Sequence, residues 1–232
     1  EYAGIGMTLN FGWTRDKIAD FLSANYLPDT SAKSTAGLLA DECNRLYGGH
    51  PGDDTTIAVL RIRQRQPVNL VIGPPAKKED DTRMMNLFFA KEGIKIVCGG
   101  TTSQVASRHL HKPILATLDY PDPDVPPTSK IEGVDLVTEG VITLSKVLTY
   151  AQDFLKTASL APVWAVGKDG ASQIARELFE NATDIHFFVG QAINPAHQNP
   201  DLPITFGVKQ QLIQSLAECL EKMGKHIRLS YF

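Results

Sequence analysis

Three short runs of mostly apolar residues constrain the fold of this chain more than any other feature. They cover residues 68–72, 94–98 and 185–189, and segments with the periodicity of amphipathic helices lie between them. Strands that are apolar on both faces are typical of parallel sheets, because the long connections between parallel strands place helices over both faces. We therefore expect a doubly wound, mostly parallel α/β (Rossmann-like) domain over residues 67–232.

The remaining elements of this domain follow from the same periodicities. Two further strands are predicted, at residues 134–137 and 227–231. Helices are predicted at residues 81–91, 103–110, 139–156, 173–181 and 208–223. Residues 112–133 contain several prolines, so we interpret them as a surface excursion that is not regular throughout.

Residues 1–66 have a different character and form the other expected domain. Helices are predicted at residues 14–25, with Thr14 as the N-cap, and at residues 32–46. Residues 55–63 are rich in β-branched side chains and are predicted to form a strand. The polar residues that follow end at Pro67, where we place the boundary between the two domains.

Charge, hydropathy and cysteine count exclude several classes of protein. The 23 basic and 26 acidic residues give a net charge of −3, which argues against a nucleic-acid partner. No apolar stretch is long enough to cross a membrane. The 3 cysteines are odd in number and far apart, as is typical of reduced thiols, so we expect a cytoplasmic protein. The chain could also form a homodimer.

The sequence GGHPGDDTTIAV at residues 48–59 is a candidate metal site. A glycine-containing turn delivers Asp53 and Asp54 to the start of the predicted strand. Carboxylates fixed in this way suit Mg²⁺ and Mn²⁺, which prefer oxygen ligands. The same residues are also common turn formers, so a turn without metal is the alternative.

Two segments of the first domain resemble metal-dependent protein serine/threonine phosphatases of the SpoIIE type. They are EYAGIGMTLNFGW at residues 1–13 and GDDTTIAVLRI at residues 53–62 with the glycine before them. The resemblance implies the C-terminal portion of a type-2C-like α/β sandwich, with Asp53 as a ligand of Mn²⁺ or Mg²⁺ and Asp54 as a weaker candidate. It also implies a phosphoprotein substrate. The Asp-Gly motif of that family is absent, so we expect this chain by itself to bind no metal and to lack phosphatase activity.

From residue 68 onward, the sequence is similar to an extra region that follows the phosphatase domain in some bacterial members of this family. The motifs CGGTT and AINPAHQNPDLP carry this similarity. The resemblance implies a domain appended to a phosphatase, which suggests a regulatory role.

The clearest candidate ligand site in the second domain is the turn between the predicted strand at 94–98 and the next helix. Gly99 and Gly100 would let a ligand approach the backbone, and Thr101 and Thr102 add hydroxyl groups at the start of a helix. This combination favours a phosphate or carboxylate. The alternative is a tight turn in which a threonine caps the helix.

The loop after the last apolar run is the second candidate. It contains Asn194 and His197, and His197 could act as a general base or contact an anion. In a parallel sheet the carboxyl ends of the strands meet at one edge, so we expect this loop and the Gly99–Thr102 turn to share one crevice.

Three functions remain open at this point. The chain could be a fragment of a metal-dependent phosphatase with a regulatory domain, or a sensor of a small anionic metabolite without catalysis. It could also be an enzyme of another kind centred on the glycine-threonine turn, with His197, Glu139 and Thr102 as its candidate catalytic residues.

Overall fold

The computed structural model describes residues 12–26, 30–117, 122–156, 163–192 and 205–232. Contacts within the chain separate the described residues into a smaller unit, which ends at Arg63, and a larger unit, which begins at Gln64 and runs to Phe232. Each unit is described by itself below.

The smaller unit is built on two helices, α1 (Arg15–Asn25) and α2 (Ala32–Leu46). Helix α2 begins where the Ser31 hydroxyl accepts a hydrogen bond from the Ser34 amide (3.1 Å). The core of the unit contains Trp13, Leu39, Cys43 and Leu46. Both helix predictions are confirmed, but Thr14 caps α1 only by its position, because its side chain makes no capping hydrogen bond.

The predicted strand at residues 55–63 is wrong. This segment has no strand structure, and the side chains of Leu60 and Ile62 are 90 % and 91 % exposed. A β-branched sequence forms a strand only beside a hydrogen-bonded neighbour, and the described part of this unit contains no strand to pair with. Asp53 therefore lies in a bend of the chain and not at the end of a strand.

The larger unit is organised around a seven-stranded sheet with the order β3-β4-β5-β2-β1-β6-β7. The parallel strands are β1 (Pro67–Ile72), β2 (Ile94–Cys98), β5 (Leu136–Thr138), β6 (Asp184–Val189) and β7 (His226–Tyr231). Two short strands, β3 (Leu115–Ala116) and β4 (Ser129–Lys130), join the β5 side in antiparallel fashion. The predicted α/β fold with a mostly parallel sheet is confirmed.

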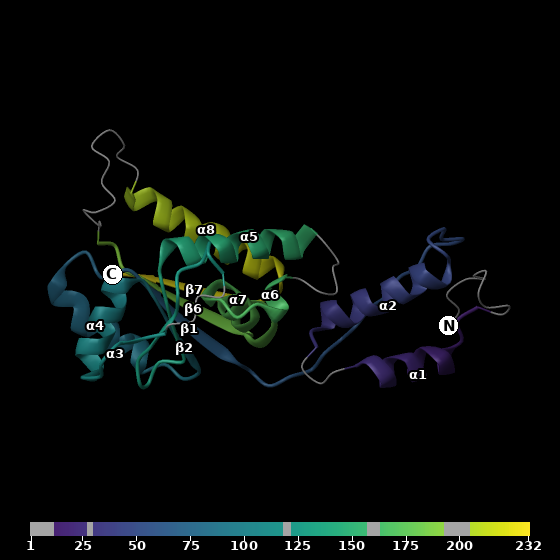
Figure 1. The fold of residues 1–232 in the computed structure, drawn as a ribbon, viewed down its shortest axis with the longest axis horizontal. Helices are drawn as coiled ribbons and strands as arrows, with labels where there is room; N and C mark the ends of the chain where they lie inside the picture. The colour runs from purple at the N-terminus through teal and green to yellow at the C-terminus, as the bar shows by residue number, and fades with distance from the viewer. Residues whose placement is uncertain (1–11, 27–29, 118–121, 157–162, 193–204) are drawn as a thin grey trace. The chain divides into compact units, whose positions relative to one another are not determined.

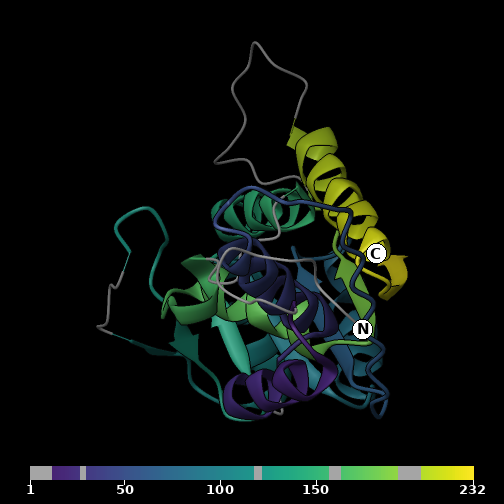
Figure 2. The same cartoon turned by 90° about the vertical axis from the view of Figure 1, so that its right-hand side faces the viewer.

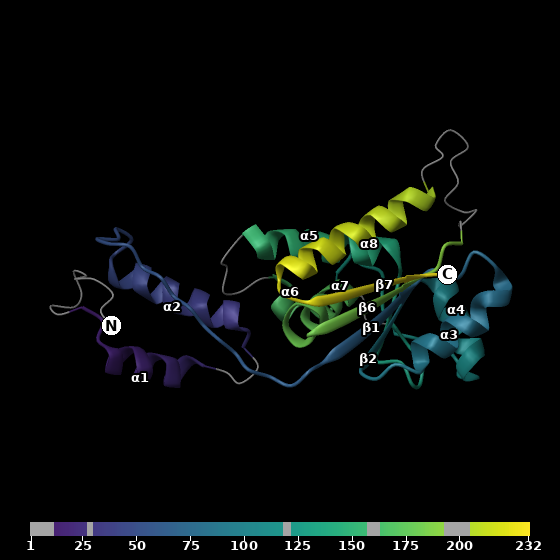
Figure 3. The same ribbon diagram turned by 180° about the vertical axis from the view of Figure 1, so that it is seen from behind.

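Helices cover both faces of this sheet. One face, which includes Leu70 and Phe187, packs against α5 (Val141–Lys156), α7 (Gly170–Ala175) and α8 (Thr205–Lys222). The opposite face, which includes Val71 and Phe188, packs against α3 (Asp81–Phe89) and α4 (Gly100–Leu110). Helices α5 and α8 run side by side in all three views (Figures 1, 2 and 3). Two separate apolar layers therefore hold the central strands.

Smaller elements complete the unit and differ in places from the prediction. A 3₁₀ turn, η1 (Lys78–Asp80), precedes α3, and the short helix α6 (Val163–Val166) was not predicted. The predicted helix at 173–181 is divided into α7 and a π-helical segment, η2 (Arg176–Asn181). The described part of the proline-containing segment is largely irregular, and the short strands β3 and β4 lie within it.

Candidate functional site

The topology of the sheet predicts a ligand site at the carboxyl end of β1. Strand β1 pairs with β2 on one side and with β6 on the other. The chain leaves β1 toward α3, on one face, and leaves β6 toward α8, on the opposite face. Ligands of open α/β sheets bind where the connections diverge in this way.

The turn between β2 and α4 is tightly packed. Gly99 has a φ of 107°, and its carbonyl oxygen accepts hydrogen bonds from both the amide and the hydroxyl of Ser103 (2.8 Å each). A Cβ atom at Gly140 would lie 3.3 Å from the Gly99 Cα atom. Gly99 is therefore required for the turn itself, as the tight-turn alternative predicts.

The two threonines in the first turn of α4 have different roles. Thr102 is buried, and its Oγ1 atom accepts a hydrogen bond from the amide of Gly73 (2.9 Å), directly after β1. Thr101 is exposed, and a side chain at Gly100 would meet open space. No side chain caps the N-terminus of α4. Thr102 thus has a structural role, whereas Gly100 and Thr101 remain open to a ligand.

Lys209, on the first turns of α8, is a site residue that the sequence analysis missed. Its ammonium group donates hydrogen bonds to the carbonyl oxygens of Gly190 and, at 3.4 Å, of Ala192. A Cβ atom at Gly73 would lie only 2.6 Å from the Lys209 Nζ atom. The ammonium group therefore lies over the carboxyl end of β1, between β1 and β6.

Burial lowers the pKa of the Lys209 ammonium group from its ordinary value. Among the ion pairs of the described residues, none involves Lys209. One sequence signal could have identified it. A lysine near the N-terminus of a helix is disfavoured by the helix dipole, so its presence there calls for another reason.

Gly73 brings these features together. Its amide binds Thr102 at the start of α4, while its Cα faces Lys209 from α8. Glycine is also needed at position 190, because a Cβ atom there would collide with the carbonyl oxygen of Pro74. The arrangement provides a positive group and the amino end of a helix at one edge of the sheet, which suits an anion.

The other predicted residues contribute less to this arrangement. Asn194 and His197 lie outside the described residues, so their place in the crevice stays a prediction. The Glu139 carboxylate accepts a hydrogen bond from the Ile142 amide at the start of α5 (3.2 Å), which is a helix-capping role.

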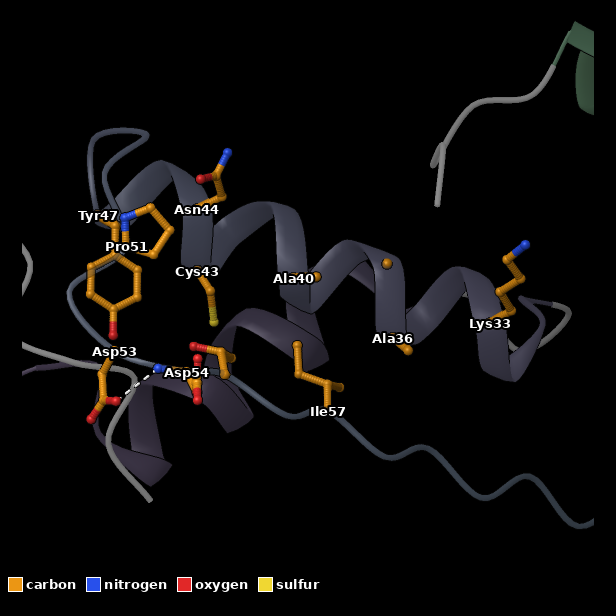
Figure 4. A pocket seen from close by; sticks show the side chains of 12 residues that line it. Lys33, Ala36, Ala40, Cys43, Asn44, Tyr47, Pro51, Asp53, Asp54 and Ile57 are labelled. Atoms are coloured by element: carbon orange, nitrogen blue, oxygen red, sulfur yellow. Dashed lines mark hydrogen bonds between the residues drawn. The ribbon is translucent and has the colours of Figure 1, made fainter. Parts of the chain in front are cut away.

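Asp53 and Asp54 lie at one end of an open groove of about 540 Å³ in the smaller unit (Figure 4). Helix α2 forms one wall, with Cys43 and Tyr47 near the aspartates and Lys33 at the far end. Both aspartates are exposed, and the Asp53 carboxylate accepts a hydrogen bond from the Asp54 amide (2.8 Å). Within the described ranges, no group of three or more potential metal ligands exists.

Comparisons with known proteins give no match: no family model, no curated protein and no solved structure matches the chain. Among the residues with a described structure, no helix has both the length and the apolarity needed to cross a membrane.

Proposed function

We propose that residues 67–232 form a regulatory domain that binds a small anionic metabolite at the carboxyl edge of the sheet. The observation that carries this proposal is the position of the Lys209 ammonium group. It lies over Gly73, next to the start of α4, with no carboxylate partner in the described structure.

The chemistry of this edge suits a phosphate or a carboxylate group. The Lys209 ammonium group supplies positive charge, and the amides of Gly100 and Thr101 at the start of α4 supply hydrogen-bond donors. The exposed Thr101 hydroxyl adds a further donor. A ligand that favours one arrangement of the chain over another would change the activity of an attached domain by a population shift.

The test compares Lys209→Met with Lys222→Met, which removes the same charge from the exposed end of α8. Inorganic phosphate and a panel of phosphorylated and carboxylated metabolites are titrated while the melting temperature and the Kd are measured. Loss of a charge-assisted hydrogen bond of about 1.5–3 kcal/mol should weaken binding by K209M about ten- to hundredfold. K222M should bind like the unchanged chain.

Gly100→Val tests the helix end separately, because a side chain at Gly100 meets open space and should not disturb the fold. We expect this change to block the amides of the turn and remove binding. If K209M and G100V both bind as well as the unchanged chain, the anion site lies elsewhere and the proposal fails.

For residues 1–66 we propose a second function, as part of a SpoIIE-type protein serine/threonine phosphatase domain that acts on a phosphoprotein. The motif around Asp53 supports it, together with the position of Asp53 and Asp54 at an open groove. When bound, Mn²⁺ or Mg²⁺ would lower the pKa of a water and neutralise phosphoryl charge. Asp53 would be one ligand, and the remaining carboxylates would have to come from residues outside the described set.

This proposal predicts that the 232-residue chain does not hydrolyse a phosphopeptide with Mn²⁺, because one assigned ligand does not make a metal site. The assay is phosphate release from phosphoserine and phosphothreonine peptides, with Asp53→Ala and Asp54→Ala as paired variants. Turnover that D53A abolishes and D54A retains would show that the chain is an active phosphatase by itself.

A further inference from the structure

Strand β7 is the edge of the sheet on the β6 side, and no described strand pairs with the outer side of its backbone. The amides of His226 and Phe232 bind the carbonyl oxygens of Thr183 and Val189, at the two ends of β6. Because backbone groups alternate along a strand, the even-numbered residues of β7 point toward β6. The amides and carbonyls of Ile227, Leu229 and Tyr231 therefore point away from the sheet.

This edge has few of the features that usually protect an edge strand from pairing. Natural proteins shorten such strands, or place proline, a bulge or charged residues, above all lysine, in them. Of these features β7 has one charged residue, Arg228. The opposite edge of this sheet follows that rule, since β3 has only 2 residues. Strand β7 has 6 residues in continuous register with β6, and its sequence, HIRLSY, contains no proline or lysine.

We propose that β7 pairs with β7 of a second copy of this chain, in antiparallel orientation, around a two-fold axis at Leu229. The two sheets would then form one continuous sheet. In this register Leu229 lies opposite Leu229 of the second copy, and Ile227 lies opposite Tyr231. Each of these residues exchanges both of its outward hydrogen bonds with the residue that it faces.

The strand selects this register because the alternatives are worse. Moving the axis to Arg228 places two arginines opposite each other, and like charges in that position are destabilising. Moving the axis to Ser230 shortens the paired segment, because Ile227 would then face a position beyond Tyr231, where β7 ends. With the axis at Leu229, Arg228 faces Ser230 of the second copy, and an aromatic residue faces a β-branched one at both ends.

The complementarity of β7 to an antiparallel copy of itself favours a second copy of the chain over a strand of another protein. The chain's own sequence gives a partner to every outward group of Ile227, Leu229 and Tyr231 without opposing charges. An edge of this length buries less surface than a standard interface of about 1,600 Å², so we expect a weak dimer that forms with rising protein concentration.

The register is tested with two single-cysteine substitutions, Leu229→Cys and Ile227→Cys. Both replaced side chains are partly buried against the same core, so the two variants are matched. The native thiols of Cys43, Cys98 and Cys219 are buried. Two copies of the residue 229 Cα atom would lie about 5.5 Å apart, within reach of a disulfide, whereas two copies of the residue 227 Cα atom would be separated by about 14 Å.

Mild oxidation should therefore convert L229C to a covalent dimer and leave I227C monomeric on a non-reducing gel. If neither variant is cross-linked, or if both are cross-linked equally, the proposed register is wrong.

The second test compares two variants of Ser230, the residue that faces Arg228 of the second copy. One variant introduces a negative charge and the other a positive charge. Ser230→Glu and Ser230→Arg both remove the hydroxyl that forms a hydrogen bond with His186 (2.8 Å), and they introduce long side chains of opposite charge. Each substitution acts twice because of the two-fold axis. We expect S230E to lower the Kd of the dimer about fivefold and S230R to raise it about fivefold.

The measurement is sedimentation equilibrium of the 232-residue chain between about 1 and 200 µM, a range suited to weak interfaces. Circular dichroism checks that both variants are folded. A chain that stays monomeric over this range overturns the proposal. So does a dimer whose Kd is the same in S230E and S230R, because it would use another surface.

Discussion

Replacing Thr102 by valine tests the structural role of this side chain. The Thr102 Oγ1 atom accepts a hydrogen bond from the Gly73 amide (2.9 Å), and so connects the start of α4 to the end of β1. Valine has nearly the same shape and lacks the acceptor. The neighbouring Thr101→Val makes the same chemical change at an exposed position, so it serves as the matched control.

The expected magnitude follows from the geometry of this contact. Leaving a buried donor without an acceptor costs about 1–3 kcal/mol, and Gly73 is only partly buried, so water can satisfy part of the loss. We therefore expect T102V to lower the free energy of unfolding by about 1–2 kcal/mol. T101V should change it by less than about 0.5 kcal/mol.

Urea unfolding followed by tryptophan fluorescence measures this difference. The chain has 2 tryptophans, of which Trp164 lies in the core of the larger unit, so a Trp13→Phe background isolates that unit. With a urea m-value of about 2 kcal/mol/M, the midpoint should fall by about 0.5–1 M in T102V. Equal midpoints for T102V and T101V would refute the structural role and return Thr102 to the ligand candidates.

Gly93→Ala should destabilise the larger unit by about 2–4 kcal/mol, because Gly93 has a φ of 91° and a Cβ atom would collide with the Pro67 carbonyl oxygen. The control Gly100→Ala places its Cβ atom in open space and should not change the urea midpoint. Burial lowers the pKa of His186 to about 4. An unfolded histidine has a pKa of about 6.5, so between pH 4 and pH 6.5 the unfolded chain binds a proton that the folded chain does not bind. The free energy of unfolding should therefore fall as the pH is lowered from 6.5 to 4, and less so in His186→Gln; equal pH dependence would contradict this. Burial raises the pKa of the Cys98 thiol to about 12, so iodoacetamide at pH 8 should label Cys98 only in urea, as mass spectrometry can show.

The main strands could be predicted because burial on both faces leaves a clear mark in the sequence. Residues 68–72, 94–98 and 185–189 are found in β1, β2 and β6. The first two runs also contain one polar residue each, Asn69 and Lys95. Both are buried within the strands, and their side chains form hydrogen bonds there. Asn69 donates to the Glu92 carbonyl oxygen (2.8 Å) and Lys95 to the Gly93 carbonyl oxygen (2.9 Å).

The features that were missed depend on residues far apart in the sequence. The strand expected at 55–63 needed a neighbour that local composition does not reveal. Lys209 gains its place in the site from Gly73 and Gly190, which lie at the ends of two other strands. The helix after the glycine-threonine turn begins at Gly100 and not at the predicted residue 103, so Thr101 and Thr102 lie in the first turn of α4. Only the structure shows that Thr102 accepts a hydrogen bond from Gly73 and that Thr101 is exposed.

The central position of β1 also sets the order in which the sheet can assemble. Val68 pairs with Ile94 on one side and with Ile185 on the other, so the second pairing closes a loop more than four times longer. The additional loop-closure entropy is about 1.3 kcal/mol, which favours the β2 side first. Pulsed hydrogen exchange during refolding should protect the amides of β2 before those of β6, and the reverse order would contradict this. During that interval β1, the middle one of the five parallel strands in the finished sheet, is a temporary outer edge. The growing domain is then most exposed to pairing with the wrong chain.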